Sequence, residues 1–561
     1  MLGGSTDAVF DVTSIGDNAQ YRGFGQFEKT GTSSWTLTGA TTAVTPWTLT
    51  SGILSIAQDE SLGDVAGILT FNGGTLRTTA SFASDRDMVL NSDAVFDTAS
   101  ATTLTANGAI SGPGGLNKTG DGILELTGVN TYGGVTAVAV GTLALTGSGS
   151  IAASTEVRVD SLFDISGTLQ GASIQSLSGV GVVELGAEVL TLTNASGTFA
   201  GEIKGAGGIA LLGGTQTLSG INSYTGNTDV SGGTLRAGAA NALSPTSAVS
   251  VRSGATVDLN GFDQTLQSLA NAGLVRFGEK PGTTLTISGD YTGNGGTLSM
   301  ATVLGGDNSQ TDRLMVRGNT SGTTQVAIVR QGGLGAQTVN GIKIVDVSGQ
   351  SGGTFSLLGD FVTKDGKQAI HGGAYAYTLQ QGGMNTPNDG NWYLTSEIKQ
   401  IDPADPDCNS TSSCPPPTAR YSPSVPVYEG YLQNMQALNK LPTLQERVGE
   451  RYWTGRNGDG QANGAAVDDK GVWARIEGAH NRLEPRTVTG GKQDINTFIM
   501  QAGVDGQFYE SDSGKLIAGI TGQYGHAKGD VSSFHGDGAI STDGWSLGAT
   551  ATWYGNSGFY V

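Results

Sequence analysis

The sequence has few charges, few prolines and almost no cysteine, and it contains no run of eighteen apolar residues. Of its 561 residues, 14% are charged, 14 are proline and 2 are cysteine. The missing apolar run excludes a helical membrane span. Residues 1–7 lack the basic and apolar regions of a secretion signal, so no export leader is recognised there.

Basic residues are also scarce. The chain has 30 Lys and Arg against 49 Asp and Glu, a formal net charge of −19. Nothing basic is clustered enough to release counterions from phosphate, so we expect no nucleic-acid partner. The acidity has a simpler reading, because net charge keeps a repetitive β protein soluble and opposes edge-to-edge association.

The two cysteines, Cys408 and Cys414, are separated by five residues in a proline-rich stretch, 397–425, which predicts a linker. In an oxidising compartment this spacing predicts a small disulfide loop. A metal site is the alternative, but it needs more soft ligands, and the four histidines are distant in sequence.

The usual signatures of catalysis are missing as well. There is no Gly-x-Ser-x-Gly elbow, no defensible His-Asp-Ser arrangement and no calcium-binding Gly-Gly-x-Gly-x-Asp array. The charged clusters 85–87 and 312–313 join adjacent residues, whose side chains point to opposite faces of a strand. We interpret both as solvated turns, and we expect no enzymatic activity, no metal and no cofactor.

Glycine is abundant, with 91 residues, and it punctuates a repeat over residues 1–300. The clearest unit runs from Gly112-Pro-Gly-Gly-Leu-Asn-Lys-Thr-Gly through Leu-Glu-Leu-Thr-Gly to Asn130-Thr-Tyr-Gly-Gly, and related copies begin near 23 and 205. Short alternating apolar segments separated by Gly, Asn and Asp predict stacked coils, since one coil cannot bury its own apolar face. We therefore expect an all-β protein built on a right-handed parallel β-solenoid; a string of small β-sandwiches is the alternative.

The region 470–561 has a different pattern of longer alternating strands. Val472, Ala474 and Ile476 share one face, and Trp473, Arg475 and Glu477 share the other. Long polar stretches at about 480–496 and 527–543 alternate with tight turns at 511–514 and 555–558, as in an outer-membrane barrel. We expect the start of such a barrel, with Arg475 and Glu477 in its lumen; a half-buried soluble sheet is the alternative.

A helix is predicted between the linker and these strands, over residues 426–455. Apolar residues recur there at three and four: Tyr428, Tyr431, Leu432, Met435, Leu438 and Leu441. Four strands cannot close a barrel without leaving backbone groups unpaired in lipid. We therefore expect the chain to be a fragment, truncated at both ends.

The repeat pattern resembles the passenger repeats of bacterial autotransporters, the type V secretion family. The segments 305–314, 372–379 and 389–394 resemble that family's pertactin-like passenger end, which caps the solenoid and helps it fold. The segment 441–449 resembles the junction between the family's helix and its barrel. The resemblance implies a passenger over 1–300, a cap over 301–396, a pore helix over 426–455 and the first part of a barrel over 470–561.

What the resemblance implies for function is self-export across the outer membrane, with the passenger at the cell surface. The expected partners are outer-membrane lipid, the barrel-assembly machinery and periplasmic chaperones. The passenger is expected to be adhesive or structural, with an unknown ligand. A surface enzyme acting on polysaccharide and a secreted structural repeat protein are the alternatives. Some family members cleave themselves at paired asparagines, but here Asn434 and Asn439 are isolated, so that activity is not carried over.

Overall fold

The computed structural model describes residues 1–398, 418–439, 443, 452–453, 466–467 and 470–561. The chain divides into two compact units, which are treated separately. Unit 1 comprises Met1–Gly333, Thr338–Gly359 and Leu379–Thr395; unit 2 comprises Leu334–Gln337, Asp360–Thr378 and Ser396–Val561. Cys408 and Cys414 lie outside the described residues, so their disulfide stays a prediction.

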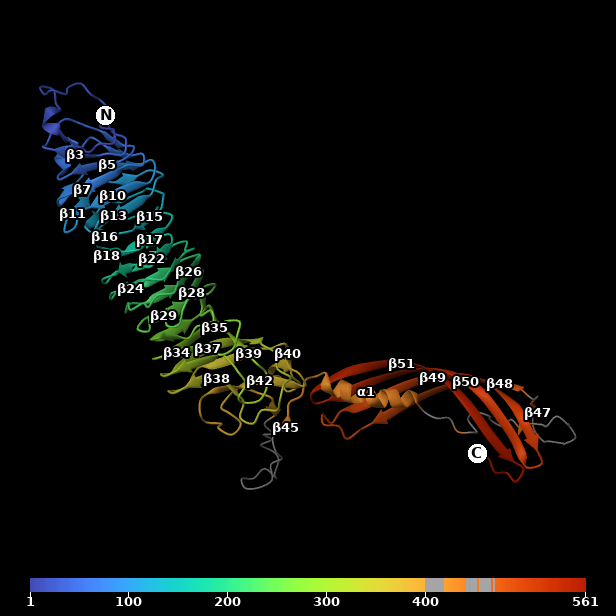
Figure 1. Ribbon diagram of the computed structural model, residues 1–561. Helices are drawn as coiled ribbons and strands as arrows, with labels where there is room; N and C mark the ends of the chain where they lie inside the picture. The colour runs from blue at the N-terminus through green and yellow to red at the C-terminus, as the bar shows by residue number, and fades with distance from the viewer. Residues whose placement is uncertain (399–417, 440–442, 444–451, 454–465, 468–469) are drawn as a thin grey trace. The chain divides into compact units, whose positions relative to one another are not determined.

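Unit 1 is a parallel β-solenoid, coloured blue through green to yellow in Figure 1. Its longest ladder joins β1 (Ala8–Asp11), β3 (Ser34–Thr38), β5 (Ile53–Ile56), β7 (Thr75–Thr78), β10 (Ala94–Thr98), β13 (Leu116–Thr119), β15 (Thr136–Val138), β17 (Val157–Val159), β20 (Leu177–Gly179), β23 (Thr198–Phe199), β26 (Thr215–Leu218), β28 (Thr234–Ala237), β30 (Thr256–Asp258), β33 (Leu274–Arg276), β35 (Tyr291–Thr302), β37 (Thr320–Arg330) and β39 (Thr354–Leu358).

Shorter parallel ladders form the other faces. One joins β8 (Phe82–Ser84), β11 (Thr103–Ala106), β14 (Ile123–Leu126), β16 (Thr142–Gly147), β18 (Leu162–Thr168), β21 (Val182–Glu184) and β24 (Glu202–Lys204). Another joins β2 (Phe27–Lys29), β4 (Trp47–Leu49), β6 (Leu69–Phe71), β9 (Met88–Leu90) and β12 (Ile110–Ser111). A third joins β19 (Ala172–Ile174), β22 (Leu190–Leu192), β25 (Ile209–Leu211), β27 (Thr228–Val230), β29 (Ala248–Val251), β32 (Ser268–Asn271) and then β35. The single-turn helices η1 (Val12–Ser14) and η2 (Asp59–Leu62) lie in the first coils.

The parallel register confirms the solenoid and excludes a string of antiparallel sandwiches. Trp35 pairs with Leu54 and Leu54 with Leu76, so one coil takes 19 to 22 residues here. Alternate side chains of each strand point inward, and the interior is filled by Leu, Val, Ile and Phe. Gly52 shows why the corners need glycine, because its φ is 69° and a Cβ there would collide with the Gly31 carbonyl.

The lysine of the repeat is buried at one of these corners. The Lys118 ammonium donates to the carbonyls of Thr119 (2.8 Å), Gly120 (2.6 Å) and, one coil on, Val140 (3.2 Å). Lys29 binds the equivalent carbonyls of its own corner. Burial lowers the pKa of Lys118 to about 8. Each lysine therefore joins one coil to the next through hydrogen bonds to backbone carbonyls.

The Asn-x-Tyr pair of the repeat is also interior. The Tyr132 hydroxyl lies 2.7 Å from Thr136 Oγ1, which donates to Ser154 Oγ one coil later (2.9 Å). The copy that begins at Asn222 repeats this with Tyr224, Thr228 and Ser247. Burial raises the pKa of Tyr224 to about 12. The repeat residues are thus structural: the tyrosine binds a threonine of its own coil, and that threonine binds a serine of the next coil.

The interpretation of the charged clusters as solvated turns was wrong for Arg86 and Asp312, whereas Asp85 and Asp87 are exposed between strands, as expected. Arg86 is buried; its guanidinium donates to the carbonyls of Asp64, Gly63 and Gly67 and pairs with Asp59 at 3.2 Å. A guanidinium carries five donors, so it satisfies three carbonyls of the loop 63–67 in the preceding coil at once. Asp312 is buried too and accepts from the backbone N–H groups of Gly282, Thr283 and Ala301.

The end of unit 1 closes the stack with a change of strand direction. The ladder β31 (Gln264–Leu266), β34 (Thr284–Ile287), β36 (Arg313–Val316) and β38 (Ile342–Val347) is parallel, and β43 (Trp392–Thr395) then pairs with β38 antiparallel. The Asp307 carboxylate accepts from Val339, Asn340 and Gly341 N–H groups at 2.8 to 3.0 Å, which fixes the loop before β38.

Unit 2 begins with a small antiparallel hairpin and continues into a helix and a long sheet. Its elements are β40 (Phe361–Val362), β41 (Gln368–Gly372), β42 (Tyr375–Gln381, whose last residues belong to unit 1), β44 (Glu397–Ile398), β45 (Thr418–Ala419), α1 (Val425–Leu438), β46 (Tyr452–Trp453), β47 (Ala466–Val467), β48 (Lys470–Leu483), β49 (Lys492–Ser511), β50 (Gly514–Ser533) and β51 (Gly536–Gly555). The Arg420 guanidinium, 2% exposed, binds both Asp365 oxygens at 2.7 and 2.8 Å.

Candidate functional site: a helix on the polar face of a long antiparallel sheet

The C-terminal strands form one antiparallel sheet in the order β48-β49-β50-β51. Three of these strands have 20 residues each, about twice the 9–11 that cross a bilayer. The long polar loops expected at 480–496 and 527–543 are mostly strand: only 484–491 and 534–535 lie between strands. Cross-strand pairs such as Arg482–Asp494 (2.9 Å) extend the hairpins through these polar sequences.

One face of the sheet is apolar and exposed. It carries Val472, Ile476, Phe498, Met500, Val504, Ile520, Trp545 and Leu547. Trp545 and Leu547 are 81% and 88% exposed. A contiguous apolar face of this kind marks contact with lipid or another apolar surface. The alternation predicted from Val472 and Trp473 onward is confirmed, since the two residues lie on opposite faces.

The other face carries α1, which lies along the strands in Figure 1. The buried helix residues are Pro426, Gly430, Asn434 and Leu438, four residues apart and therefore on one side of the helix. Asn434 donates to the Ala527 carbonyl (3.2 Å) and to Thr542 Oγ1 (2.8 Å).

Polar groups of the sheet and loops complete this contact. Gln493 donates to the Gly430 carbonyl (3.0 Å), and Gln523 donates to the Leu438 carbonyl (3.1 Å). The Glu429 carboxylate accepts from the N–H groups of Val488 and Thr489. Leu438 also packs against Ile495, Ile499 and Ala527. The helix is thus bound by hydrogen bonds along its length and by one apolar cluster at its end.

Sequence periodicity identified the helix, but of the periodic residues that the structure describes only Leu438 is buried in the contact. The aromatic and apolar residues that predicted it, Tyr428, Tyr431, Leu432 and Met435, are exposed. α1 ends at Leu438, and Tyr452 lies in β46. Most of the remaining predicted region, 440–455, lies outside the described residues, so its boundary stays a prediction.

The missed signal is a set of glycines on the strands beneath α1. A Cβ on Gly525 would lie 2.9 Å from Leu438 Cδ2, and a Cβ on Gly529 would lie 2.7 Å from Asn434 Oδ1. A Cβ on Gly538 would lie 2.5 Å from Val427 Cγ2. These glycines allow the close approach of helix and sheet, and glycine at alternate strand positions is readable from sequence.

Arg475 and Glu477 lie on the α1 face of β48, opposite Gln501 and Ile499. Their charged groups are 3.5 Å apart, so they contact each other, with side chains about three-quarters covered. Their placement in a barrel lumen stays a prediction. Within the described ranges, no group of three or more His, Cys, Asp or Glu is placed to hold a metal ion. No helix in the described part of the chain is both long and apolar enough to cross a membrane.

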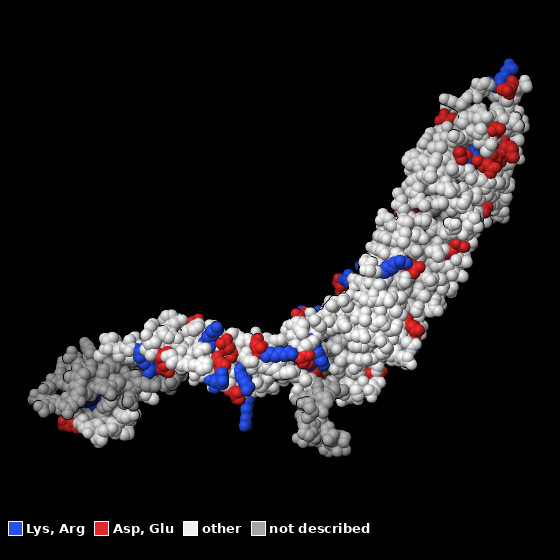
Figure 2. All heavy atoms as spheres, turned by 180° about the vertical axis from the view of Figure 1, so that it is seen from behind, with Lys and Arg blue, Asp and Glu red and all other residues white. Residues whose placement is uncertain are grey.

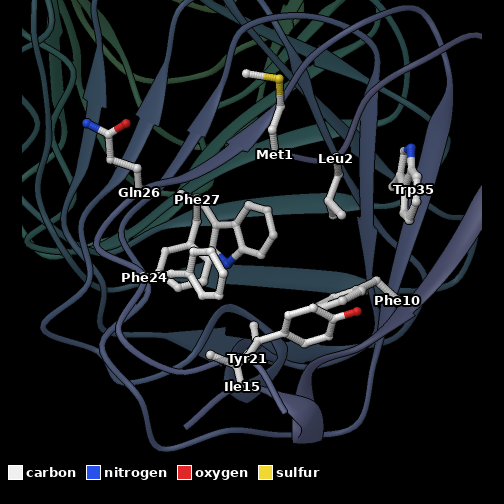
Figure 3. A pocket seen from close by; sticks show the side chains of 10 residues that line it. Met1, Leu2, Phe10, Ile15, Tyr21, Phe24, Gln26, Phe27 and Trp35 are labelled. Atoms are coloured by element: carbon white, nitrogen blue, oxygen red, sulfur yellow. The ribbon is translucent and has the colours of Figure 1, made fainter. Parts of the chain in front are cut away.

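An apolar cavity of about 300 Å³ lies in the first coils of unit 1 (Figure 3). Tyr21 lies between Phe10 and Phe24, with ring centroids 5.5 and 6.3 Å away, and Phe27 packs on Trp47 at 5.4 Å. Phe27 and Trp47 belong to β2 and β4, so this cavity continues the solenoid's interior row of apolar side chains. We assign it no separate chemistry.

The chain runs from a solenoid into a helix that lies on the polar face of a long antiparallel sheet. This is the architecture of an exported passenger followed by a translocator. The chain belongs to the bacterial autotransporters. The family model "Autotransporter beta-domain" matches residues 472–561, and "Autochaperone Domain Type 1" matches 264–379. "Passenger-associated-transport-repeat" matches 27–56, 116–145 and 213–237. The β-domain locates the chain at the outer membrane, with the passenger exposed at the surface.

Curated relatives agree with this assignment. The chain is 36% identical over 563 residues to "Adhesin BmaC autotransporter" of Brucella suis biovar 1 (strain 1330), covering 100% of this chain and 13% of that protein. It is 33% identical over 284 residues to "Autotransporter adhesin AIDA-I" of Escherichia coli, covering 50% of this chain and 19% of that protein. "Uncharacterized protein YdeU" of Escherichia coli (strain K12) is 36% identical over 303 residues, or 51% of this chain and 59% of that protein. The chain therefore spans only part of the relatives it matches.

Proposed function

We propose that this chain serves the export of its own β-solenoid to the bacterial surface, through a pore that the 470–561 strands help to form and α1 occupies. The observation that carries the proposal is the two-faced sheet, with exposed apolar residues on one side and α1 on the other. In the pore of a membrane barrel, polar groups and helix contacts are internal, and the apolar face meets lipid.

We further propose that the passenger is adhesive or structural and has no catalytic activity. Two relatives are named adhesins. The charged residues of the sequence clusters are engaged in the fold: Asp85 accepts from Asn107, Asp87 from the Ala109 N–H, and Arg86 and Asp312 bind backbone groups. Such residues bind neighbouring coils rather than a substrate. The proposed partners are outer-membrane lipid, the barrel-assembly machinery and periplasmic chaperones, with no nucleic acid.

The export proposal is tested by one charge placed on each kind of surface. In the cells that produce the protein, Leu547→Arg puts a cation on the apolar face of the sheet, and Val180→Arg puts one on an exposed apolar position of the solenoid. Arginine at the bilayer midplane costs about 2–4 kcal/mol in membrane barrels, whereas surface substitutions cost within about 0.5 kcal/mol.

Surface display is measured by protease shaving of intact cells, and membrane insertion by fractionation. Leu547→Arg is expected to reduce both, and Val180→Arg is expected to reduce neither. Leu547→Ile is the conservative control and keeps display. Equal display of Leu547→Arg and the unchanged protein would show that this face does not meet lipid.

A further inference from the structure

A cleft on the outside of the solenoid gathers five charged side chains, and export uses none of them. It encloses about 570 Å³ beside β28, β30 and β33 and the loop 277–283. That volume is in the range of small-ligand sites. Figure 2 shows few charged side chains along the face of the solenoid in view, apart from a group near its N-terminal end. The cleft brings five charged side chains together. The lining includes Arg236, Asp258, Asn260, Phe262, Arg276, Glu279 and Lys280.

The strand register sets the charges of this cleft. Arg236 pairs with Asp258, and Asp258 pairs with Arg276, so one carboxylate lies between two guanidinium groups on successive strands. Such neighbours are about 4.8 Å apart. Arg236 forms the ion pair with this carboxylate: its Nη2 and Nε lie 2.9 and 3.0 Å from Asp258 Oδ2. The Asp258 side chain is only 5% exposed, so this pair is a fixed wall of the cleft.

The remaining charges are held loosely. Arg276 Nη2 contacts Glu279 Oε1 at 3.2 Å, but the Glu279 side chain is 86% exposed, and exposed pairs contribute little. Lys280 is exposed next to it, and no ion pair of Lys280 occurs in the described part of the chain. Three cations against two carboxylates leave the cleft at +1, on a chain of net charge −19. A single ligand carboxylate can therefore replace the Glu279 carboxylate at Arg276 and also form an ion pair with Lys280.

An aromatic ring lies at the rim of the same cleft. Asn260 and Gly261 both have left-handed backbone angles, with φ of 52° and 82°, and the turn that they form leaves Phe262 36% exposed. The exposed Asn260 amide is beside it. A half-exposed ring, an amide and a guanidinium together match a sugar that carries one carboxylate: the ring packs on the sugar's apolar face, and the guanidinium binds the carboxylate through two hydrogen bonds.

We propose that this cleft binds a carboxylate-bearing sugar unit of a surface glycan, with the carboxylate on Arg276 and Lys280 and the sugar ring on Phe262. The proposal rests on the proposed adhesive role of the passenger and gives that role a ligand class. Nucleic acid is a poor fit, because a polyanion gains little from one net positive charge and is repelled by the rest of the chain.

The test is calorimetric titration of the full chain with three acidic probes: a hyaluronan tetrasaccharide, an oligogalacturonate and sialyllactose. The neutral N-acetylglucosamine tetramer and an eight-residue thymidine oligonucleotide are the comparison ligands. At least one acidic sugar is expected to bind, and both comparison ligands are expected to fail. Absence of binding by all three acidic sugars, or equal binding of either comparison ligand, overturns the proposal.

Variants separate this site from general charge effects. Lys280→Gln is expected to weaken binding about tenfold, the loss of one charge-assisted hydrogen bond, and Arg276→Gln is expected to weaken it by more than that, because the guanidinium makes two. Glu279→Gln is expected to strengthen binding severalfold, because it removes the competing carboxylate. Arg158→Gln, an exposed ion-paired arginine on β17, is the matched control and leaves binding unchanged. Equal effects of Arg276→Gln and Arg158→Gln would contradict the assignment.

Failure here and failure of the export proposal are distinguishable. Protease shaving reports surface display, and calorimetry reports sugar binding. If the passenger is displayed but binds none of the three acidic sugars, only the proposal for sugar binding in the cleft is refuted. If Leu547→Arg and Val180→Arg show equal surface display, only the export proposal is refuted.

Discussion

Asn130 offers the sharpest prediction about the repeat, because one buried side chain joins three coils. Its Oδ1 accepts from the Ile110 N–H (2.9 Å), and its Nδ2 donates to the carbonyls of Gly128 (3.0 Å) and Ser150 (3.1 Å). Asn130→Ala removes all three hydrogen bonds and leaves the backbone in place.

The size of the destabilisation depends on which hydrogen bonds each partner of the Asn130 side chain keeps in Asn130→Ala. The Ser150 carbonyl keeps the Asn130 backbone N–H (2.9 Å), and the Gly128 carbonyl keeps the Ser150 N–H (3.1 Å). The Ile110 N–H, in contrast, loses the acceptor that Asn130 supplies, and Ile110 is buried. An orphaned buried donor costs about 1–3 kcal/mol, which corresponds to a rise of about 5- to 150-fold in local opening.

Amide hydrogen exchange of the full chain, read by mass spectrometry on peptides that contain Ile110, measures this directly. Asn222→Ala is an internal replicate, since Asn222 accepts from the Ile203 N–H (2.8 Å) in the second copy of the motif. Asn91→Ala is the control, because Asn91 is exposed and bonds only exposed Asn72 (3.0 Å). If exchange at Ile110 rises no more in Asn130→Ala than in Asn91→Ala, the asparagine does not hold the coils together.

Further predictions concern buried charges in each unit. The Arg420 guanidinium holds the pKa of Asp365 well below its usual range, so this pair stabilises the fold above the ordinary carboxylate pKa and its contribution is lost as the pH falls through the lowered value. Asp365→Asn leaves a buried arginine unpaired. Urea unfolding should show a free energy of unfolding lower by about 3–5 kcal/mol at pH 7 and a weaker dependence of that free energy on acid pH. An unchanged dependence on acid pH would count against the pair. Burial lowers the pKa of Lys118 to about 8 from 10.5, so the folded state binds fewer protons than the unfolded state between those values, and stability rises with pH there. Lys118→Met should abolish that rise in unfolding experiments from pH 7.5 to 10.5, and persistence of the full rise would assign it to other groups.

The parts of the fold that depend on strict alternation could be predicted from sequence. In a strand, adjacent side chains point to opposite faces whatever their partners, so the opposite faces of Val472 and Trp473 follow from spacing alone. Solenoid coils could be predicted too, because the glycine-punctuated unit that begins at Gly112 returns in related copies near 23 and 205. The boundaries of passenger, cap, linker, helix region and barrel stay predictions.

What could not be predicted depends on partners distant in sequence. The 480–496 segment reads as a loop because it is polar, yet backbone pairing and the Arg482–Asp494 contact extend the strands through it. Arg86 reads as a solvated turn, but its donors are satisfied by carbonyls about 20 residues earlier. The helix packs by Gly430 and Asn434 on strand glycines, so its aromatic positions did not identify the buried side.

The central claim is that one face of the 470–561 sheet meets lipid while α1 lies on the other. Two native tryptophans test it: Trp545 is on the exposed apolar face, and Trp473 is buried on the opposite face. The measurement is quenching of intrinsic fluorescence by lipid with brominated acyl chains, for the full chain in membranes. Trp553 lies on the same face of β51 as Trp545, so both are replaced together. Loss of most of the quenching in the double variant Trp545→Phe/Trp553→Phe, but not in Trp473→Phe, is the predicted result. Equal losses, or a larger loss in Trp473→Phe, would contradict the account.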